Sequence, residues 1–456
     1  MEQKKALLCL AHMSGNEIKY IQEAFDTNWV VPLGPNVNGF EDDLKRYVCS
    51  EKNYQAMGTS EELYPNETYP QTIQPHENNP ESLWKKSIQG LENKELVALS
   101  AGTAALHLAL VALGVKAGDE VICQSFTFCA SSHPVTYQGA TPVFVDSEAD
   151  TWNIDPELLE TAIKDRIEKT GRKPKAIIVV YLYGMPARID EILAIANKYD
   201  IPLIEDAAEG LGSRYKNQVV GTFGTFGVLS FNGNKMITTS GGGALICDGK
   251  EMKHRIMFFA TQAREAFPYY QHEEIGFNYR MSNICAGIGR GQMTVLEEHI
   301  AHHKHITHLY AEGLKDVKGV RLHLNPSADF DSNYWLNTIT LDEELKVKNQ
   351  AEAYGKAITG AIGGAAGFVH STGEAHTSSE PNTNVEAMRL ELEKEGIESR
   401  PLWKPMHLQP VYANSPAYTN GISEKLFKSG LCLPSGPMVS DEDVRHIIEA
   451  IKNCIA

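Results

Sequence analysis

Short apolar runs recur along the middle of the chain, and helix-forming stretches separate them. The runs are apolar at successive positions, so strands formed there would be buried on both faces. Buried strands that alternate with helices are typical of a mainly parallel sheet covered on both sides. We therefore predict an α/β fold, with strands at residues 96–99, 120–123, 141–146, 176–183, 202–205 and 227–231 and helices at 104–113 and 190–199.

The pattern differs on either side of this region. Two helices are predicted before it, at 14–26 and 37–48, and a stretch rich in Asn, Glu, Pro, Thr, Ser and Tyr follows them as a polar insertion. Residues 241–247 are predicted to pair as an edge strand. A long helix at 296–314 leads to a smaller α+β region, with a strand at 334–341 and helices at 386–395 and 441–454. The expected division is an N-terminal segment (1–49), the insertion (50–95), a large domain (96–300) and a small C-terminal domain (301–456).

Composition excludes some classes of protein. The 456 residues are 42% hydrophobic and 22% charged, which suits a soluble chain with a sizeable core. A net charge of -16 and the absence of a Lys/Arg block argue against nucleic acid as a partner. The eight cysteines form no CxxC pair, and no apolar stretch approaches the length of a membrane span, so we expect a cytoplasmic protein with reduced thiols.

A histidine-rich stretch lies in the predicted helix 296–314. His299 and His303 are four residues apart, as zinc ligands can be, but the sequence has no HExxH motif and no third ligand near them. We therefore predict a solvated helix and no metal site.

A candidate phosphate site lies where the first strand of the large domain meets its helix. Residues 100–103 read Ser-Ala-Gly-Thr, and Gly102 and Thr103 would stand at the helix N-terminus with unpaired backbone N–H groups and a hydroxyl. The alternative is a simple N-cap by Ser100 or Thr103. The chain has no GxxxxGK[ST] motif and no well-placed GxGxxG, so a phosphate-bearing cofactor other than a nucleotide fits better.

Carboxylates gather at the end of the strand 202–205. Ligand groups in parallel sheets lie at this edge, where Asp206 could hold a proton on a pyridinium nitrogen. For Glu205, capping of a following helix is the plain alternative. Phe128, after another strand, could cover a flat ring or simply be a core aromatic.

Lys235 follows the strand 227–231 and precedes a run of glycines. A buried or half-buried lysine is a usable nucleophile, and a Schiff base with a carbonyl cofactor is one common use. The alternative is a lysine that extends from the corner into solvent. The phosphate-type helix start and the acidic strand end favour the cofactor.

In this order along the chain, these features resemble the DegT/DnrJ/EryC/StrS group of pyridoxal-phosphate-dependent sugar aminotransferases. The resemblance implies fold type I, with a mainly parallel seven-stranded sheet and a smaller C-terminal α+β domain. Longer strings around Lys235, at 261–265 and at 400–407 are similar to the subgroup that aminates UDP-linked 4-keto sugars on the way to bacillosamine. The family strings are residues 100–107, 125–128, 205–209, 230–235 and 276–283.

The resemblance also implies roles for individual residues. Lys235 would carry pyridoxal 5'-phosphate as a Schiff base and then move a proton during transfer. Asp206 would pair with the pyridine nitrogen, Glu209 would lie near the ring O3′, and Phe128 would stack on the ring.

The phosphate and the second subunit complete the implied site. Gly102, Thr103 and Ser230 would hold the phosphate, helped by Asn278 of a second subunit, so that a homodimer shares its active sites. Asn232, counted among the cofactor-binding positions, stands where many relatives have His. That difference leaves Lys235 as the sole obvious proton shuttle.

The implied substrates are L-glutamate and a UDP-4-keto-6-deoxy sugar. Arg400, Trp403 and His407 are candidates for binding the nucleotide sugar or the amino donor. A GDP- or dTDP-linked sugar, or amination at C3, is the nearest alternative. A non-catalytic, aminotransferase-like sensor or assembly protein is the alternative from another class. The dehydratase branch of the family has His in place of the lysine, so Lys235 disfavours that chemistry.

Overall fold

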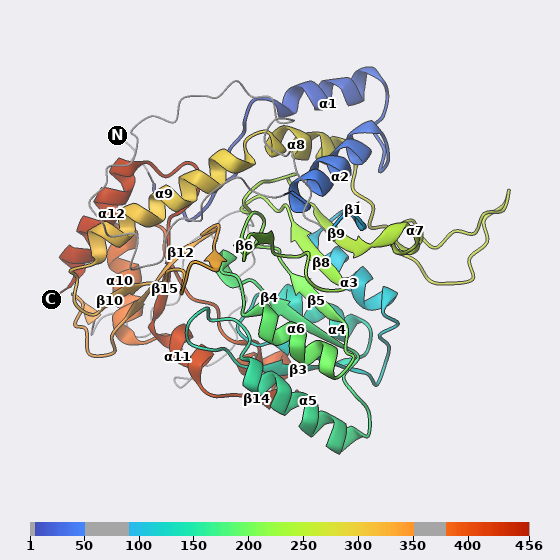
Figure 1. Ribbon diagram of the computed structural model, residues 1–456. Helices are drawn as coiled ribbons and strands as arrows, with labels where there is room; N and C mark the ends of the chain where they lie inside the picture. The colour runs from blue at the N-terminus through green and yellow to red at the C-terminus, as the bar shows by residue number, and fades with distance from the viewer. Residues whose placement is uncertain (1–4, 51–90, 351–379, 456) are drawn as a thin grey trace.

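The computed structural model describes residues 5–50, 91–350 and 380–455, and most of the predicted insertion lies outside these ranges. A sheet of eight strands forms its centre (Figure 1). In spatial order the strands are β1 (Lys94–Leu99), β9 (Gly243–Asp248), β8 (Phe226–Ser230), β5 (Leu203–Asp206), β4 (Ala176–Val180), β2 (Glu120–Gln124), β3 (Thr141–Val145) and β14 (Ala417–Tyr418). Neighbours from β8 to β14 are parallel, which confirms the predicted α/β class.

Strand β9 lies inside the sheet, so the prediction of an edge strand at 241–247 was wrong. It pairs antiparallel with β8 on one side and with β1 on the other, and Gly243 faces both Ser230 and Leu99. The last two residues of the predicted insertion belong to β1. The two-residue β14 comes from the C-terminal part and adds an eighth strand to the seven that were predicted.

Helices cover both faces of the sheet because side chains alternate along each strand. In β4, Ile177 and Val179 join one core cluster, and Ile178 joins the other. The first cluster includes α2 (Pro35–Val48), α5 (Pro156–Thr170) and α6 (Ile189–Lys198); the second includes α3 (Gly102–Ala112), α4 (His133–Tyr137) and α7 (Gly249–Ala260). The N-terminal α1 (Glu17–Asp26) packs with α2 against α8 (Asn283–Met293) (Figure 1).

The C-terminal part has its own sheet and its own core. Four antiparallel strands lie in the order β10 (Val320–Leu322), β12 (Asn337–Leu341), β15 (Gly430–Leu433) and β13 (Arg400–Pro401). Side chains from this sheet pack with α9 (Leu296–Leu314), α10 (Thr383–Lys394) and α12 (Asp441–Cys454). Further elements are α11 (Ile422–Ser429) and a small sheet of β11 (Phe330–Asp331), β6 (Arg214–Tyr215) and β7 (Gln218–Val219).

Helix α9 connects the two parts, and the predicted boundary at residue 300 falls within it. The sequence analysis predicted a solvated helix here, and that prediction was wrong. His299 bonds through Nδ1 to the Met236 carbonyl (3.1 Å), and His303 to the Tyr334 carbonyl (3.0 Å). Both rings are buried, and burial lowers the pKa of His303 to about 3. Over the described ranges, no cluster of three His, Cys, Asp or Glu side chains could hold a metal.

All eight cysteines are free thiols, six of them buried. Among the helices of residues 5–50, 91–350 and 380–455, none has both the length and the apolar character to cross a membrane.

Candidate active site

The carboxyl end of β5 carries three buried carboxylates in different surroundings. Glu205 caps no helix, which corrects the alternative considered for it. Its oxygens accept hydrogen bonds from the Tyr181 hydroxyl and from the backbone N–H groups of Gly221, Phe223 and Gly224. Because its acceptors are all taken up by the protein, Glu205 fastens the loop that leads into β8 and is not available to a ligand.

Asp206 lies one residue further along and points the other way. Its Oδ2 accepts a hydrogen bond from Ser131 Oγ (2.7 Å), and its Oδ1 accepts one from the Ala208 N–H (3.2 Å). Burial raises the pKa of Asp206, and the Ser131 and Ala208 bonds oppose the rise. A carboxylate held this way, at the sheet edge where ligands bind, can accept a proton shared with a basic ring nitrogen.

Lys235 and Glu209 face each other across this edge. Lys235 is in the turn after β8, and its side chain is 14% exposed, so it does not extend into solvent. Its Nζ is 3.3 Å from Glu209 Oε1 and 4.0 Å from the ring centroid of Trp335. Glu209 Oε2 accepts a hydrogen bond from the Tyr183 N–H (2.7 Å). Burial raises the pKa of Glu209 to about 7, against the attraction of Lys235.

The start of α3 meets the end of β8 and the start of β9. A Cβ placed on Gly102 would lie 3.0 Å from the Ser230 Cβ and 3.3 Å from its Oγ. The Gly243 backbone is closer still, since a Cβ there would lie 2.4 Å from the Gly102 nitrogen. The N-cap is Ala101, without a side-chain cap, so capping by Ser100 or Thr103 was wrong. The helix N–H groups, the half-buried Thr103 and the Ser230 hydroxyl form a cradle suited to a phosphate.

Four aromatic rings form a group that reaches Lys235 through Trp335. Trp403 lies between Phe128 (ring centroids 5.5 Å apart) and Tyr183 (5.2 Å), with Trp335 at 6.4 Å. Phe128 is 55% exposed, so it is not a core residue and can cover a ring. The Tyr183 hydroxyl accepts a hydrogen bond from the Trp403 backbone N–H (3.0 Å). Tyr183 thus connects the C-terminal segment to Glu209, which accepts a hydrogen bond from the Tyr183 N–H.

The sequence did not single out Ser131, Tyr183 or Trp335. Ser131 and Tyr183 follow β2 and β4, strands that end at the same edge as β5, and this shared position is the signal that could have found them. Trp335 comes from the C-terminal part, and only the tertiary structure brings it to Lys235.

The other predicted residues are less closely grouped. Asn232 is exposed, and its Nδ2 lies 3.4 Å from Asn234 Oδ1. Asn278 is exposed and pairs with Thr261 through the backbone. Arg400 in β13 binds Glu398 (2.9 Å), and His407 Nδ1 lies 2.6 Å from Ser125 Oγ. Of the substrate candidates, Trp403 alone lies in the aromatic group that includes Trp335.

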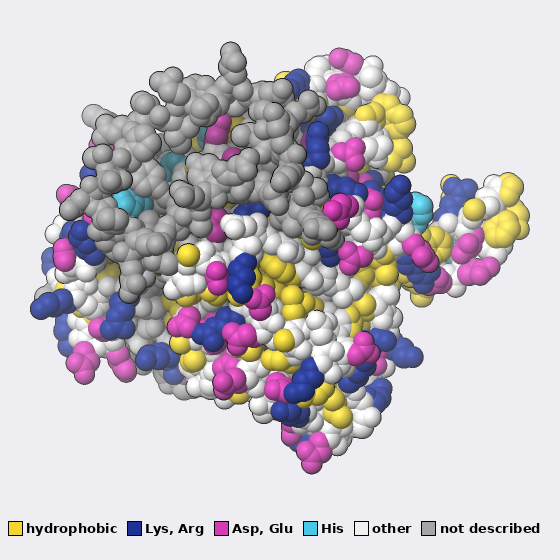
Figure 2. All heavy atoms as spheres, viewed as in Figure 1, with side chains coloured by type: hydrophobic (Ala, Val, Ile, Leu, Met, Phe, Trp, Pro, Cys, Tyr) yellow, Lys and Arg dark blue, Asp and Glu magenta, His cyan; other side chains and the backbone are white. Residues whose placement is uncertain are grey.

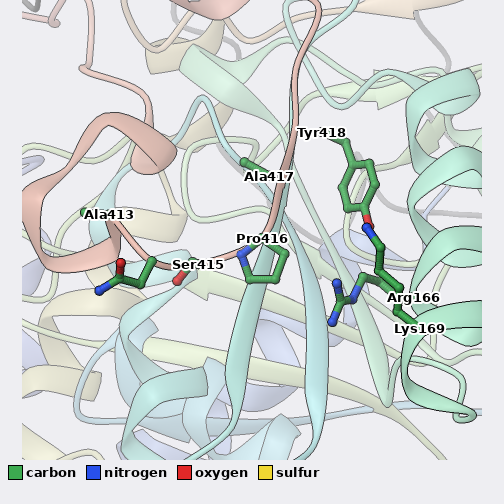
Figure 3. Close-up of a pocket in the computed structure, with 8 residues that line it drawn as sticks. Arg166, Lys169, Ala413, Ser415, Pro416, Ala417 and Tyr418 are labelled. Carbon is green, nitrogen blue, oxygen red and sulfur yellow. The ribbon is translucent and has the colours of Figure 1, made fainter.

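A separate open pocket lies at the β14 edge of the large sheet. Arg166 and Lys169 of α5 face the segment 413–418 across it (Figure 3). No predicted site residue lines this pocket. Arg166 already binds both oxygens of Glu120, at 2.6 and 2.9 Å, so its charge is taken up within the protein.

Pyridoxal phosphate fits the residues around β5. The group needs an amine for its aldehyde, an acid for its ring nitrogen and a cradle for its phosphate. Lys235, Asp206 and the Gly102–Ser230 contact supply these at one sheet edge. The fold and the site together define a pyridoxal-phosphate-dependent aminotransferase of fold type I.

The chain belongs to the DegT/DnrJ/EryC1/StrS aminotransferase family, whose model matches residues 81–372 and 365–452. It is 40% identical over 452 residues to the putative pyridoxal phosphate-dependent aminotransferase EpsN of Bacillus subtilis, with 98% of this chain and 95% of that one covered. It is 31% identical over 442 residues to the GDP-perosamine synthase of Escherichia coli O157:H7, covering 96% and 95%.

Among solved structures, a DegT/DnrJ/EryC1/StrS aminotransferase from Brucella abortus is 26% identical, with a TM-score of 0.73 over 96% of this chain and 95% of that one. These relationships identify the chain as a pyridoxal-phosphate-dependent sugar aminotransferase.

Proposed function

We propose that the enzyme transfers the amino group of L-glutamate to C4 of a UDP-linked 4-keto-6-deoxy sugar, UDP-2-acetamido-2,6-dideoxy-4-keto-hexose. The products are the UDP-4-amino sugar and 2-oxoglutarate. The observation that carries the proposal is the Lys235 amine, seated between Glu209 and Trp335 beside the buried Asp206. The sugar assignment rests on the strings around Lys235, at 261–265 and at 400–407.

In this proposal each residue at the sheet edge has a separate role in the reaction. Pyridoxal phosphate bound here would supply an electron sink and a temporary acceptor for the amino group. Lys235 takes the proton from the donor Cα and returns one at the acceptor carbon. Asp206 holds the ring nitrogen in its protonated form. Glu209 fixes the position of Lys235 by their 3.3 Å contact.

Binding uses groups that do not change protonation. The α3 N-terminus, Thr103 and Ser230 bind the phosphate through N–H and O–H donors. Phe128 covers one face of the ring. Trp403, half-buried beside Phe128, offers an aromatic surface for the nucleotide sugar. The phosphate donors let an acidic protein bind the anionic cofactor locally.

A homodimer is part of this proposal, with Asn278 reaching the phosphate of the second subunit. Support comes from the arm formed by residues 262–276, which projects from the molecule near α7 (Figures 1 and 2). The arm exposes Tyr270 (77%) and Ile275 (86%), and Arg255 anchors it through two hydrogen bonds to Glu274 at 2.6 and 2.8 Å. Large exposed apolar side chains on an anchored arm are typical of a protein interface.

The dimer is tested by sedimentation of a Tyr270→Ser, Ile275→Ser double variant. We expect weaker association and loss of cofactor. Met438→Ser, which changes an exposed side chain just before α12, serves as the control and should leave association unchanged. A double variant that associates like the parent protein would contradict the role of the arm.

A GDP-linked 4-keto sugar is the second candidate, favoured by the relative named GDP-perosamine synthase. The deciding experiment mixes the holoenzyme with L-glutamate and measures loss of the cofactor's yellow colour. UDP- and GDP-linked keto sugars are then compared as acceptors by kcat/KM. A preference for the GDP sugar would refute the nucleotide assignment, and no colour change with glutamate would refute the donor.

A further inference from the structure

A chain of two hydroxyls leads to Asp206. Ser131 Oγ lies 2.7 Å from Asp206 Oδ2, and Thr127 Oγ1 lies 2.7 Å from Ser131 Oγ. Ser131 ends the short 3-10 helix Cys129–Ser131, and both hydroxyl residues are buried. Neither residue belongs to the set predicted to bind the cofactor or the substrate.

The direction of these hydrogen bonds follows from counting hydrogens. An ionised carboxylate only accepts hydrogen bonds, so the single hydrogen of Ser131 points to Asp206. Ser131 is then the acceptor for Thr127, whose hydrogen points to Ser131. Each bond polarises the next, which strengthens the donor that reaches the carboxylate.

The same segment is anchored at its other end. The Met406 N–H donates to the Ser125 carbonyl (2.8 Å), and the Ser125 hydroxyl lies 2.6 Å from His407 Nδ1. Residues 125–131 therefore run from the C-terminal segment to Asp206, with Thr127 next to the exposed Phe128. The position of the Ser131 donor is fixed by the protein.

We propose that Ser131, oriented by Thr127, is a positioning residue that keeps Asp206 ionised and so keeps the shared proton on the cofactor's ring nitrogen. The inference rests on the proposed pairing of Asp206 with that nitrogen. Loss of a donor to a buried carboxylate favours its neutral form, so the proton moves from the ring nitrogen to the carboxyl group. A hydrogen bond to a charged group changes such an equilibrium about tenfold or more.

The test loads the enzyme with pyridoxal phosphate labelled with nitrogen-15 in the ring and records the ring-nitrogen signal. In Ser131→Ala, we expect the signal to move from the protonated towards the neutral position. We expect kcat to fall about tenfold with little change in KM, and Ser131→Thr to restore both. The control is Ser132→Ala, because Ser132 is equally buried and its hydroxyl donates to the Cys129 carbonyl (3.2 Å).

A separate variant tests the hydrogen bond from Thr127 to Ser131. Thr127→Val keeps the shape but removes the donor to Ser131, so the signal should move in the same direction by less, and Thr127→Ser should restore it. A Ser131→Ala signal equal to that of Ser132→Ala would overturn the proposal, and an unmoved Thr127→Val signal would overturn the part played by Thr127. If the parent enzyme already shows a neutral ring nitrogen, the pairing with Asp206 fails instead.

Discussion

Glu209 is expected to make the protein less stable as the pH rises from about 4.5 to 7. Its carboxyl group is buried, and burial raises its pKa from 4.5 to about 7, although Lys235 and the Tyr183 N–H both favour the ionised form. The folded protein therefore binds a proton that the unfolded chain has already released between these two values. The perturbation that isolates this effect is Glu209→Gln, which keeps the size and one acceptor oxygen but cannot ionise.

The sign and size follow from linkage. Below pH 4.5 the group is protonated in both states and contributes no penalty. Between pH 4.5 and 7 folding takes up a proton, so stability falls with rising pH, and the loss is complete above pH 7. The pKa of Glu209 differs by about 2.5 between the unfolded and the folded protein. This difference corresponds to about 3 kcal/mol of unfolding free energy, since one pKa unit is worth 1.36 kcal/mol. Glu209→Gln should remove this fall.

The assay is urea denaturation of the cofactor-stripped protein and the variant at pH 5, 6, 7 and 8. Relative to the parent, Glu209→Gln should gain stability with rising pH, by up to about 3 kcal/mol. Glu274→Gln is the control. Glu274 is exposed, and its bonds to Arg255 lower its pKa, so its loss should not produce a gain of this kind. A constant difference between Glu209→Gln and the parent from pH 5 to 8 would refute the assigned burial effect.

Three further variants test the site directly. Lys235→Ala should abolish transamination, and undiminished turnover of the purified variant would refute the assignment. Asp206→Asn should retain the cofactor but lower kcat about a hundredfold, so near-normal rates would exclude its role at the ring nitrogen. Gly243→Ala would put a Cβ 2.4 Å from the Gly102 nitrogen, and we expect about 1–3 kcal/mol lower stability and weaker cofactor binding. Gly241→Ala, whose Cβ would meet nothing within 4 Å, should leave both measurements unchanged.

Much of the large domain could be predicted from local patterns. The buried strands of a parallel sheet are apolar at successive positions, and β4 and β5 were recognised on that basis. Asp206 was found because it directly follows the strand predicted at 202–205, and Lys235 because it lies between the strand predicted at 227–231 and a run of glycines. Strand β9 was placed wrongly because its apolar run does not indicate which neighbours it pairs with. Gly243, where β9 begins, also lies close to the start of α3, and this tertiary contact is not visible in the local pattern.

The C-terminal contribution to the site could not be read from local patterns. Trp335 is a core residue of a region whose hydrophobic pattern is loose, yet its ring lies under the Lys235 amine and its Nε1 donates to the Asn234 carbonyl (2.6 Å). The burial of α9 was missed for a related reason. Its histidines bond to carbonyls on distant segments, so a helix that looks polar in sequence is largely enclosed.

The three carboxylates at the carboxyl end of β5 show why residue type alone does not assign roles. Glu205 accepts four hydrogen bonds from its own protein and is structural. Glu209 has one N–H donor and one amine, so its charge depends on Lys235 and on pH. Asp206 has one hydroxyl and one N–H donor, which stabilise its ionised form without filling every acceptor position. Because an acid must be charged and still have room for one more donor to hold a ring nitrogen, Asp206 is the member of the group suited to that task.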